Sequence, residues 1–373
     1  MTDISALSRL FTPFRLRSLE LRNRFVMSPM SRYASPEGVF SPDLMAYYAR
    51  RAAHDVALVT SESAAIERPA SFENPAIPRV YGDKALAAWR EASHLVHARG
   101  GAMAAQLWHI GVWPPSGDYR PPAPFEGPSG LGGPDRAPIG VAMSDEDIAD
   151  TIAAFAAAAR NCRKAGVDLV ELHGGHGFLI DQFFWDVTNR RTDKWGGATI
   201  GERTAFGREV IRAVRAAVGD EMPVTMRISQ WRIDDYGRRL APSPQVLEEW
   251  VAPLADAGVD LFHCSQRRFW EPEFEGSDLN FAGWVKKVSG KPTMTVGSVG
   301  LSTDLVESVG QGAGSSAQPS RLEELARRFE RGDFDLVAVG RALVSDPAWV
   351  SKVRAGDFDG LNDFQPADLM TLI

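Results

Sequence analysis

Eight short apolar segments recur along the chain, and longer segments with helical periodicity separate them. The short segments are rich in Val, Leu, Ile and Met and do not alternate with polar residues, which is typical of strands covered on both faces of a parallel sheet. A strand–helix unit repeated eight times predicts an α/β protein with a closed (β/α)8 TIM barrel. The predicted strands are Arg24–Met30, Val56–Ser63, Ala102–Trp108, Asp168–His173, Val224–Ser229, Leu261–Ser265, Thr293–Gly297 and Leu336–Gly340.

The segment Ser144–Lys164 shows most clearly how these strands are connected. Ser144 and Asp147 have the spacing of a capping box, an apolar stripe follows them, and Gly166 stands where a helix would end. The same helix-end-then-strand pattern occurs twice, as "AGVDLVELHGG" from Ala165 and "AGVDLFHCSQ" from Ala257. Such an internal repeat is expected of a barrel built from similar units.

A doubly wound sheet is the competing architecture. It would need a glycine fingerprint at its first strand–helix turn, and the sequence has none there. The glycine-rich stretch "GQGAGSS" from Gly310 follows a polar segment, and we interpret it as a flexible loop.

Segments outside the repeating units are expected to close the two ends of the barrel. The stretch "LFTPFRLRSLELRNRF" alternates in strand fashion around Arg17 and Ser18, which predicts an N-terminal β-hairpin capping one end. Two long loops, Val112–Gly140 and Gln266–Trp284, are expected at the C-terminal face, where they would shape a substrate mouth. The aromatic part of the second loop, 267–277, matches no ligand pattern and could simply cover the mouth. We expect one domain, 1–373.

Composition limits the partners and the compartment. With 373 residues, 44% of them hydrophobic, the chain can bury a large core, and its net charge of −7 does not favour nucleic acid or an anionic membrane. No apolar run is long enough to span a bilayer. The two cysteines, Cys162 and Cys264, cannot make a disulfide framework. We expect a soluble cytoplasmic protein that acts on a small molecule, and homo-oligomerisation stays open.

Polar and glycine residues gather at the predicted C-terminal strand ends, where TIM barrels place their chemistry. After the seventh and eighth strands, Gly297, Ser298 and Gly340 would let backbone N–H groups approach a phosphate, and Arg341 would add a bidentate donor. These two ends therefore predict a phosphate site. Taken alone, Gly297 or Gly340 could also be an ordinary turn glycine.

Two further polar groups face the same mouth. Gln106 offers an amide, and Arg227 offers a permanent cation. A flavin ring accepts such hydrogen bonds, and a cation near its N1 side stabilises the reduced anion, so flavin mononucleotide (FMN) would use the phosphate site and both side chains. For Arg227 alone, a structural ion pair inside the barrel is the alternative.

His173 and His176 lie three positions apart in "HGGH" after the fourth strand. Their spacing alone does not separate a metal site, a proton relay and a clamp for a polar substrate atom. A metal site would need a third ligand, for which His109 and His263 are candidates.

Six ordered motifs carry a family resemblance: "FVMSPMSRY", "QLWHIG", "HGGHGFLIDQFF...TNRRTDKWGG", "VTMRIS", "TVGSVG" and "VAVGRALVSDP". In order and spacing they resemble the old yellow enzyme family of flavin-dependent ene-reductases, from about Leu10 to about Phe358. The resemblance implies a (β/α)8 barrel with noncovalent FMN, reduced by NADH or NADPH in a ping-pong reaction. The FMN contacts that it implies are Ser28, Pro29, Met30, Ser31, Ser63, Gln106, Arg227, Gly297, Ser298, Gly340 and Arg341.

The resemblance also suggests roles at the substrate. His173 and His176 match the pair that binds the substrate carbonyl oxygen, so they are predicted to stabilise the negative charge that builds there during hydride transfer. Many relatives place a proton-donating tyrosine where this chain has Phe178. Tyr33 resembles a substrate-contacting tyrosine of one bacterial subgroup, while Trp108 resembles another. Tyr33, Trp108 and Phe178 are therefore predicted substrate contacts, and Tyr33 is a candidate proton donor.

Three other functions are open at this point. An FMN enzyme of the same family could desaturate a carbonyl compound or oxidatively demethylate an amine. A flavin-free barrel lyase or isomerase could act on a phosphorylated metabolite. A third reading is a non-catalytic flavin-binding protein.

Overall fold

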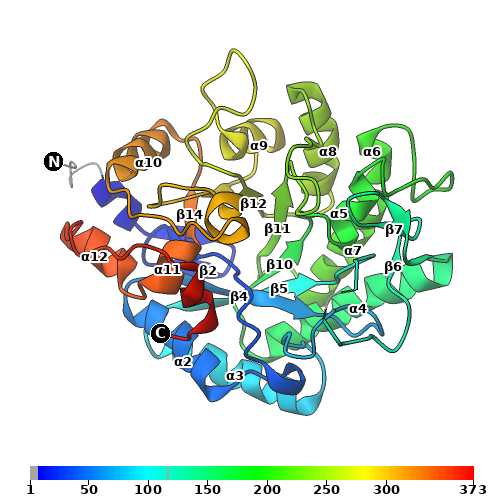
Figure 1. Cartoon of the computed structure of the whole chain (residues 1–373), viewed down its shortest axis with the longest axis horizontal. Helices are drawn as coiled ribbons and strands as arrows, with labels where there is room; N and C mark the ends of the chain where they lie inside the picture. Colours follow the sequence, from blue (N-terminus) through cyan, green and yellow to red (C-terminus); the bar gives the residue numbers. More distant parts are fainter. Residues whose placement is uncertain (1–6, 116) are drawn as a thin grey trace.

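The computed structural model describes residues 7–115 and 117–373. Its centre is a closed barrel of parallel strands in the order β10, β11, β12, β13, β14, β3, β4, β5 (Figure 1). All eight predicted strands are confirmed, and the first is shorter than predicted. They are β3 (Phe25–Met27), β4 (Leu58–Ala65), β5 (Ala102–Trp108), β10 (Leu169–His173), β11 (Val224–Ser229), β12 (Leu261–Ser265), β13 (Thr293–Val296) and β14 (Leu336–Val339).

Helices surround the barrel and bury its outer face. The predicted capping box at the start of α4 is present, since Ser144 Oγ accepts the N–H of Asp147 at 3.1 Å and the Asp147 carboxylate accepts the N–H of Ser144 at 2.9 Å. The α-helices are α2 (Pro42–Ala53), α3 (Asp83–His97), α4 (Asp145–Lys164), α5 (Leu179–Phe184), α6 (Ile200–Arg203), α7 (Ala205–Val218), α8 (Pro244–Asp256), α9 (Phe281–Ser289), α10 (Ser320–Arg331), α11 (Arg341–Ser345) and α12 (Trp349–Ala355). Short helical turns are η1 (Ser8–Phe11), η2 (Pro36–Gly38), η3 (Val306–Gly310) and η4 (Pro366–Met370).

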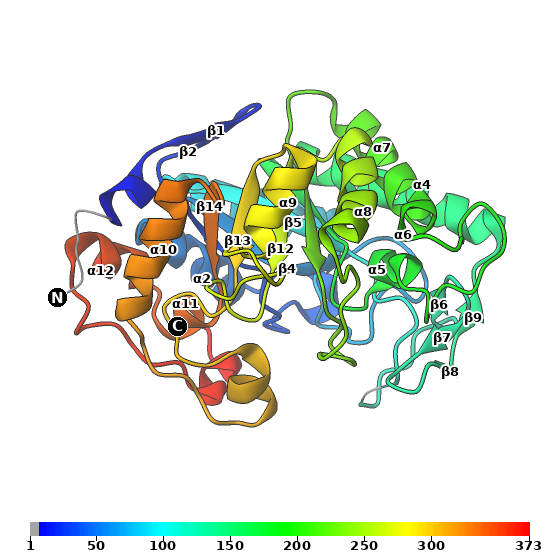
Figure 2. The ribbon, with the colours of Figure 1, turned by 90° about the horizontal axis from the view of Figure 1, so that it is seen from above.

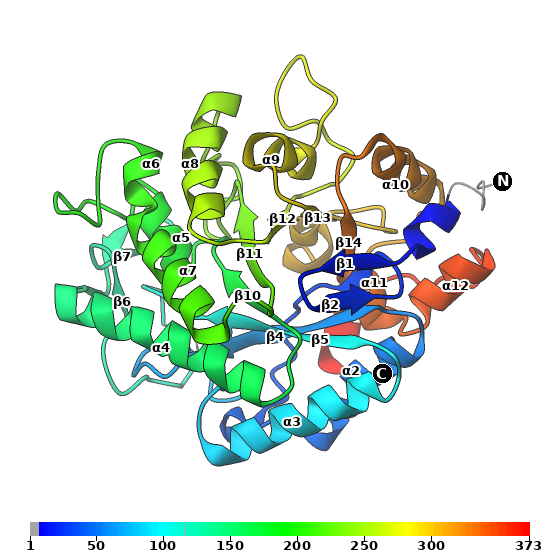
Figure 3. The ribbon, with the colours of Figure 1, turned by 180° about the vertical axis from the view of Figure 1, so that it is seen from behind.

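The predicted N-terminal hairpin consists of β1 (Phe14–Leu16) and β2 (Leu19–Leu21) and lies across one end of the barrel (Figure 3). Its apolar side chains pack into the barrel interior together with residues from the strands. Arg17 Nε donates to Asp260 Oδ1 at 2.6 Å, and the N–H of Ser18 donates to the Glu221 carbonyl at 3.1 Å. Both acceptors precede strands, so the hairpin seals the N-terminal end and leaves the other end for chemistry.

Long connections gather at the opposite side from the hairpin (Figure 2). The loop after β5 carries two short strand pairs, β6 (Glu126–Gly127) with β9 (Val141–Ala142) and β7 (Leu131–Gly132) with β8 (Ala137–Pro138). The loop predicted over Gln266–Trp284 ends early, because Asn280 caps α9 and the helix begins at Phe281.

Two smaller findings complete the fold. The stretch 311–316 contains no helix or strand and touches the rest of the chain through an isolated bridge between Ser315 and Phe364. In the described ranges, no helix is long and apolar enough to cross a membrane.

Candidate active site

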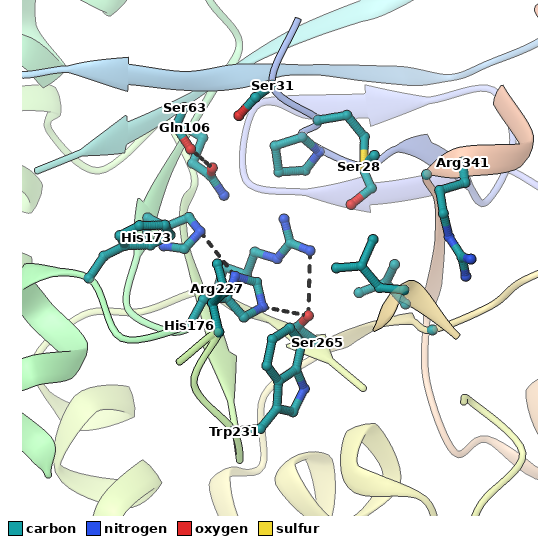
Figure 4. A pocket seen from close by; sticks show the side chains of 18 of the residues that line it. Ser28, Ser31, Ser63, Gln106, His173, His176, Arg227, Trp231, Ser265 and Arg341 are labelled. Carbon is teal, nitrogen blue, oxygen red and sulfur yellow. Dashed lines mark hydrogen bonds between the residues drawn. The ribbon is translucent and has the colours of Figure 1, made fainter. Parts of the chain in front are cut away.

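A cavity of about 420 Å³ opens at the C-terminal ends of the strands (Figure 4). All of the site residues predicted from the sequence line it: Ser28, Pro29, Met30, Ser31, Tyr33, Ser63, Gln106, Trp108, His173, His176, Phe178, Arg227, Gly297, Ser298, Gly340 and Arg341. The volume is that of an ordinary cofactor or small-molecule site.

The segment Ser28–Ser31 leaves β3 along the wall next to β14. The N–H of Ser28 donates to the Val339 carbonyl at 2.9 Å, and the pairing between β3 and β14 ends there. A Cβ at Gly340 would lie 3.4 Å from Met30 Sδ and 3.8 Å from Ser28 Cβ, which are ordinary contact distances. The two strand ends therefore lie side by side, and residues of both line the cavity.

Arg341 begins α11 at the end predicted to bind phosphate. Its guanidinium donates to the carbonyls of Thr303 and Asp304, each at 2.8 Å, and also to Ser298 Oγ at 3.2 Å and to Ser308 Oγ. We expected a free bidentate donor, but these contacts tie the guanidinium to the loop before η3. Burial lowers the pKa of Arg341 to about 10, so it is still a cation at neutral pH. Gly340 and Arg341, at the start of α11, both line the cavity, so the charge of Arg341 lies at this end of it.

The backbone conformation at position 297 itself requires a glycine. Its φ is +152°, and a Cβ there would lie 2.8 Å from the Gln266 carbonyl oxygen. The turn-glycine alternative therefore explains this residue without any ligand. The same close packing also leaves its backbone exposed to the cavity.

Gln106 belongs to a buried polar chain beneath the cavity. Ser63 Oγ donates to Gln106 Oε1 at 2.6 Å, and Gln106 Nε2 donates to Glu171 Oε1 at 2.8 Å. The second Glu171 oxygen lies 2.8 Å from His263 Nδ1. Burial alone would raise the pKa of Glu171, but His263, Arg227 and Gln106 hold it below its usual range. These hydrogen bonds fix the side-chain amide of Gln106. Its oxygen accepts from Ser63, and one of its two N–H groups remains free to donate.

Arg227 is a buried cation in the cavity wall. Burial lowers its pKa to about 10 although Glu171 opposes the shift. Its Nε has no hydrogen-bond partner within the described chain, and Nη2 reaches only Ser265 Oγ, at 3.4 Å. An internal ion pair with Glu171 therefore does not satisfy Arg227, which leaves it able to bind a ligand atom in the cavity.

His173 and His176 meet edge to edge. His176 Nδ1 lies 3.3 Å from His173 Nε2, and His176 Nε2 lies 2.8 Å from Ser265 Oγ (Figure 4). The left-handed backbone of His176, with φ +66°, turns its ring toward His173, and Trp231 stacks on it at 4.5 Å between centroids. Burial, followed by the charge of Arg227, lowers the pKa of both imidazoles well below the usual value. Both rings are therefore neutral at physiological pH.

Neither candidate third metal ligand is available at the His173–His176 pair, because both are held by carboxylates. His263 is bound to Glu171, and His109 Nε2 lies 3.2 Å from Glu126 Oε1. Over residues 7–115 and 117–373, no group of three or more His, Cys, Asp or Glu side chains has an arrangement that could hold a metal ion.

Comparison with known proteins decides the family. Residues 9–315 match the model of the NADH:flavin oxidoreductase / NADH oxidase family. The chain is 33% identical to chanoclavine-I aldehyde reductase fgaOx3 of Penicillium roqueforti, over 94% of this chain and 90% of the relative. It is 30% identical to NADPH dehydrogenase of Bacillus subtilis, over 91% and 92%. A solved structure of morphinone reductase in complex with tetrahydroNAD superposes with a TM-score of 0.78 at 25% identity, covering 96% of this chain and 93% of that one.

The chain belongs to the old yellow enzyme family. It is therefore an FMN-dependent oxidoreductase that takes its electrons from NADH or NADPH. The residues present fit the cofactor. The unpartnered Nε of Arg227 and the free N–H of Gln106 suit the polar edge of a flavin ring, and Arg341 with the strand-end glycines suits its phosphate.

The part of the cavity beside His173 is aromatic. Phe178 lies 4.8 Å from His173 and 5.3 Å from both Trp108 and Trp113, measured between ring centroids. Tyr33 is 50% exposed at the cavity mouth, and its backbone N–H donates to Glu62 Oε2 at 3.2 Å. Burial, followed by the negative charges of Glu73 and Glu62, raises the pKa of Tyr33, so its hydroxyl stays protonated.

Sequence reasoning missed several residues that line the cavity. Ser265 ends the sixth predicted strand, and Trp231 follows the fifth by two positions, so strand-end position could have indicated both. Arg267, which stacks on Tyr236 at 4.0 Å, lies in the loop that had no assigned pattern. Glu73 lies in a loop after β4 and had no periodic signal. The further members are Ile77, Trp113, Ile233, Tyr236, Gln266, Val296, Val299, Leu301 and Leu305.

Proposed function

We propose that this family member reduces the C=C bond of α,β-unsaturated carbonyl or nitro compounds, and that its own residues serve this step as follows. The observation that carries the proposal is the pair of neutral imidazoles whose Nε2 and Nδ1 atoms lie 3.3 Å apart. FMN bound in this cavity would supply hydride transfer from NADH or NADPH to the β-carbon of the alkene. A proton then reaches the α-carbon, which balances the addition of two electrons and two hydrogens.

The histidine pair binds the oxygen of the activating group. Two nitrogens this close can both donate to one oxygen atom, and two aligned donors stabilise the negative charge that develops there. For this, the proton of His176 must be on Nδ1. Arg227 has only donors, so at Ser265 the hydroxyl oxygen accepts from Arg227 and its hydrogen is available to His176 Nε2. Ser265 thereby favours the tautomer that donates to substrate.

Other residues of the cavity would hold the cofactor. Gln106 and Arg227 would bind the flavin ring, and Ser28 to Ser31 line the same cavity. Arg341, Ser298 and the backbone at Gly340 would bind the phosphate. The buried charge of Arg227 would stabilise the anionic reduced ring.

The proton donor differs from the usual one, because Phe178 has no acidic hydrogen. Tyr33 is protonated and lines the same cavity, and the cavity mouth admits water. We propose that one of these two supplies the proton to the α-carbon.

The test is a pair of rapid-mixing experiments on the purified yellow protein under anaerobic conditions. Flavin absorbance should bleach on addition of NADH or NADPH and return on addition of 2-cyclohexenone, with the saturated ketone as product. The rates of bleaching with the two nicotinamides give their order of preference. A colourless protein would favour the lyase or isomerase alternative. Reduction without reoxidation by any enone or nitroalkene would favour desaturation, amine oxidation or a non-catalytic flavoprotein.

The finer cellular assignment also belongs to the proposal. Cys162 and Cys264 are buried free thiols in the structure, which suits a reducing compartment and supports a cytoplasmic enzyme. The proposed partner is a small-molecule substrate, and neither nucleic acid nor membrane has a role in the reaction.

A further inference from the structure

One carboxylate in the cavity wall has no cationic partner. Glu73 lines the cavity from the loop after β4, and its Oε2 is buried with no hydrogen-bond partner among the residues described. Burial raises its pKa, and only its own backbone N–H opposes that effect. Elsewhere near this mouth, by contrast, Glu126 pairs with Arg68 at 2.8 Å. Glu73 as a whole is half-buried, but a carboxylate whose buried oxygen has no partner is unfavourable unless a ligand compensates it.

Aromatic side chains surround the same part of the cavity. Tyr33 and Trp113 follow β3 and β5, the two strands that flank β4, and the charge of Glu73 acts on Tyr33. Trp108 and Phe178 also line the cavity, and they belong to the same apolar cluster as Phe72 and Ile77 of the Glu73 loop. Faces of tryptophan and tyrosine attract a cation, most strongly where water is excluded. A carboxylate among aromatic rings is the chemistry that recognises an ammonium group.

The loop that carries Glu73 is fixed on both sides. The N–H of Ile110 donates to the Ser71 carbonyl at 3.0 Å, and the N–H of Ser35 donates to the Ala76 carbonyl at 3.2 Å. The carboxylate is therefore held in the wall before any ligand arrives, which reduces the ordering needed on binding.

The arginines that line the cavity come from other strands than the Glu73 loop. Arg227 lies on β11, Arg267 follows β12 and Arg341 follows β14, and Figure 4 shows Arg341 across the cavity from Ser63 and Gln106 on β4 and β5. The Arg341 end, which suits the cofactor phosphate, and the Glu73 loop after β4 thus belong to different parts of one cavity.

We propose that Glu73 and the aromatic side chains around it form a subsite for a positively charged nitrogen, so that the substrate is an activated alkene that also carries a protonated or quaternary amine. This inference deepens the proposed function and rests on it for the alkene, whereas the ammonium subsite itself can be measured without turnover.

The experiment uses two enones of the same shape and the oxidised holoenzyme. One is a cyclohexenone with a 2-(trimethylammonio)ethyl substituent, and the other is its neutral 3,3-dimethylbutyl isostere. Binding is followed by the change in flavin absorbance in the absence of nicotinamide, so no reaction occurs. The parent should bind the cationic enone about tenfold or more tightly than the neutral one. In Glu73→Gln this preference should disappear, while affinity for the neutral enone stays within about twofold.

Two further variants serve as controls. Glu67→Gln removes an exposed carboxylate from the same loop without touching the cavity, and it should keep the preference. Glu73→Asp keeps the negative charge and should retain part of the preference for the cationic enone. Equal affinity of the parent for the two enones would overturn the proposal. So would an equal loss of both ligands in Glu73→Gln, which would mean that Glu73 supports the cavity as a whole.

A separate measurement keeps the two proposals apart. Reoxidation of reduced flavin by the neutral enone tests alkene reduction, and it should proceed at the parental rate in Glu67→Gln, whose carboxylate lies outside the cavity. If the parent reduces neither enone but still binds the cationic one preferentially, the alkene proposal fails and the ammonium subsite stands. If Glu73→Gln slows the neutral enone as much as the cationic one, Glu73 acts in the reaction and the subsite is wrong.

Discussion

Nε2 of His176 lies 2.8 Å from Ser265 Oγ, and the same hydroxyl lies 3.4 Å from Arg227 Nη2. The arrangement connects Arg227, which we propose to bind the flavin, with His176, which we propose to bind the substrate oxygen. Since Arg227 can only donate, the serine oxygen accepts from it, and we propose that the serine hydrogen is donated to His176 Nε2. In that arrangement the second imidazole nitrogen carries the proton that the proposed clamp needs.

Replacing Ser265 therefore tests the tautomer. In Ser265→Ala, reoxidation of the flavin by an enone should slow about tenfold, because His176 is no longer held in the donating form. Ser265→Thr keeps the hydroxyl and should stay near the parental rate. Stopped-flow absorbance measures both. An alanine variant as fast as the parent would show that the tautomer does not depend on this serine.

The histidine pair itself should matter more. His173→Ala and His176→Ala should each slow reoxidation by about a hundredfold or more, the usual cost of losing one oxyanion donor. Bound flavin should remain at one per chain, since neither ring is needed to retain it. The ratio of absorbance at the flavin maximum to that at 280 nm checks this. Parental rates in both variants would contradict the clamp.

Arg341→Ala should weaken FMN binding by roughly 2–3 kcal/mol, on the order of a hundredfold, through loss of a charge-assisted contact. The structure requires a control, because Arg341 also holds the loop at 303–308. Ser308→Ala removes one loop contact and keeps the charge, so its FMN affinity should be close to parental. Fluorescence of released FMN measures both affinities. Equal weakening in the two variants would assign Arg341 to the loop alone.

The barrel could be predicted from the sequence because strands covered on both faces leave apolar runs that are easy to find. Boundaries depended on local detail. The first strand stops at Met27 instead of Met30, since Pro29 has no N–H with which to continue the ladder. The loop after β12 ends at Asn280, whose side chain accepts the N–H of Gly283 at 2.8 Å and starts α9 sooner than expected.

The site could be predicted as far as strand-end position and family resemblance reach. Gln106 and Arg227 lie where expected. The sequence could not indicate contacts between distant loops, such as the hydrogen bonds from Arg341 to backbone carbonyls. Nor could it indicate that Glu73 Oε2 has no hydrogen-bond partner among the described residues. These depend on how loops meet after folding, and no local pattern encodes them.

Glu62 provides a test of stability against pH. It is buried behind Tyr33, and burial raises its pKa from 4.5 to about 7. Between these two values the folded state binds a proton that the unfolded state has lost, so the free energy of unfolding falls as pH rises. The contribution is fully present below about pH 4.5 and is lost above about pH 7.

Urea titrations at pH 5 and pH 8 measure this effect. Ionisation of Glu62 should make the free energy of unfolding of the parent about 2–3 kcal/mol lower at pH 8 than at pH 5. Glu62→Gln cannot ionise at this position. Its free energy of unfolding, taken relative to that of the parent, should therefore rise by the same amount between pH 5 and pH 8. Glu67→Gln, at an exposed position, should follow the parent at both values. A constant gap between Glu62→Gln and parent would mean that the carboxyl is ionised throughout.

Phe178 stands where the sequence resemblance predicts a proton-donating tyrosine in many relatives, and its ring centroid lies 4.8 Å from that of His173. A hydroxyl introduced there would enter the substrate side of the cavity. General acid catalysis is typically worth about 10²–10⁴-fold, but it accelerates turnover only where protonation is slow. We therefore expect Phe178→Tyr to speed reoxidation by a poorly reactive enone by about tenfold or more and to leave a reactive enone almost unchanged.

The companion variant is Tyr33→Phe, which removes the protonated hydroxyl at the cavity mouth. If Tyr33 donates in the parent, this change slows the poor enone, and Phe178→Tyr in the same chain restores the rate. If water donates, Tyr33→Phe has the parental rate, while Phe178→Tyr still accelerates the reaction. Reduction of flavin by the nicotinamide should be the same in all variants, because no α-carbon is protonated in that step. Failure of Phe178→Tyr to change any enone, in a parent that hardly reduces activated alkenes, would replace ene-reduction by desaturation or amine oxidation.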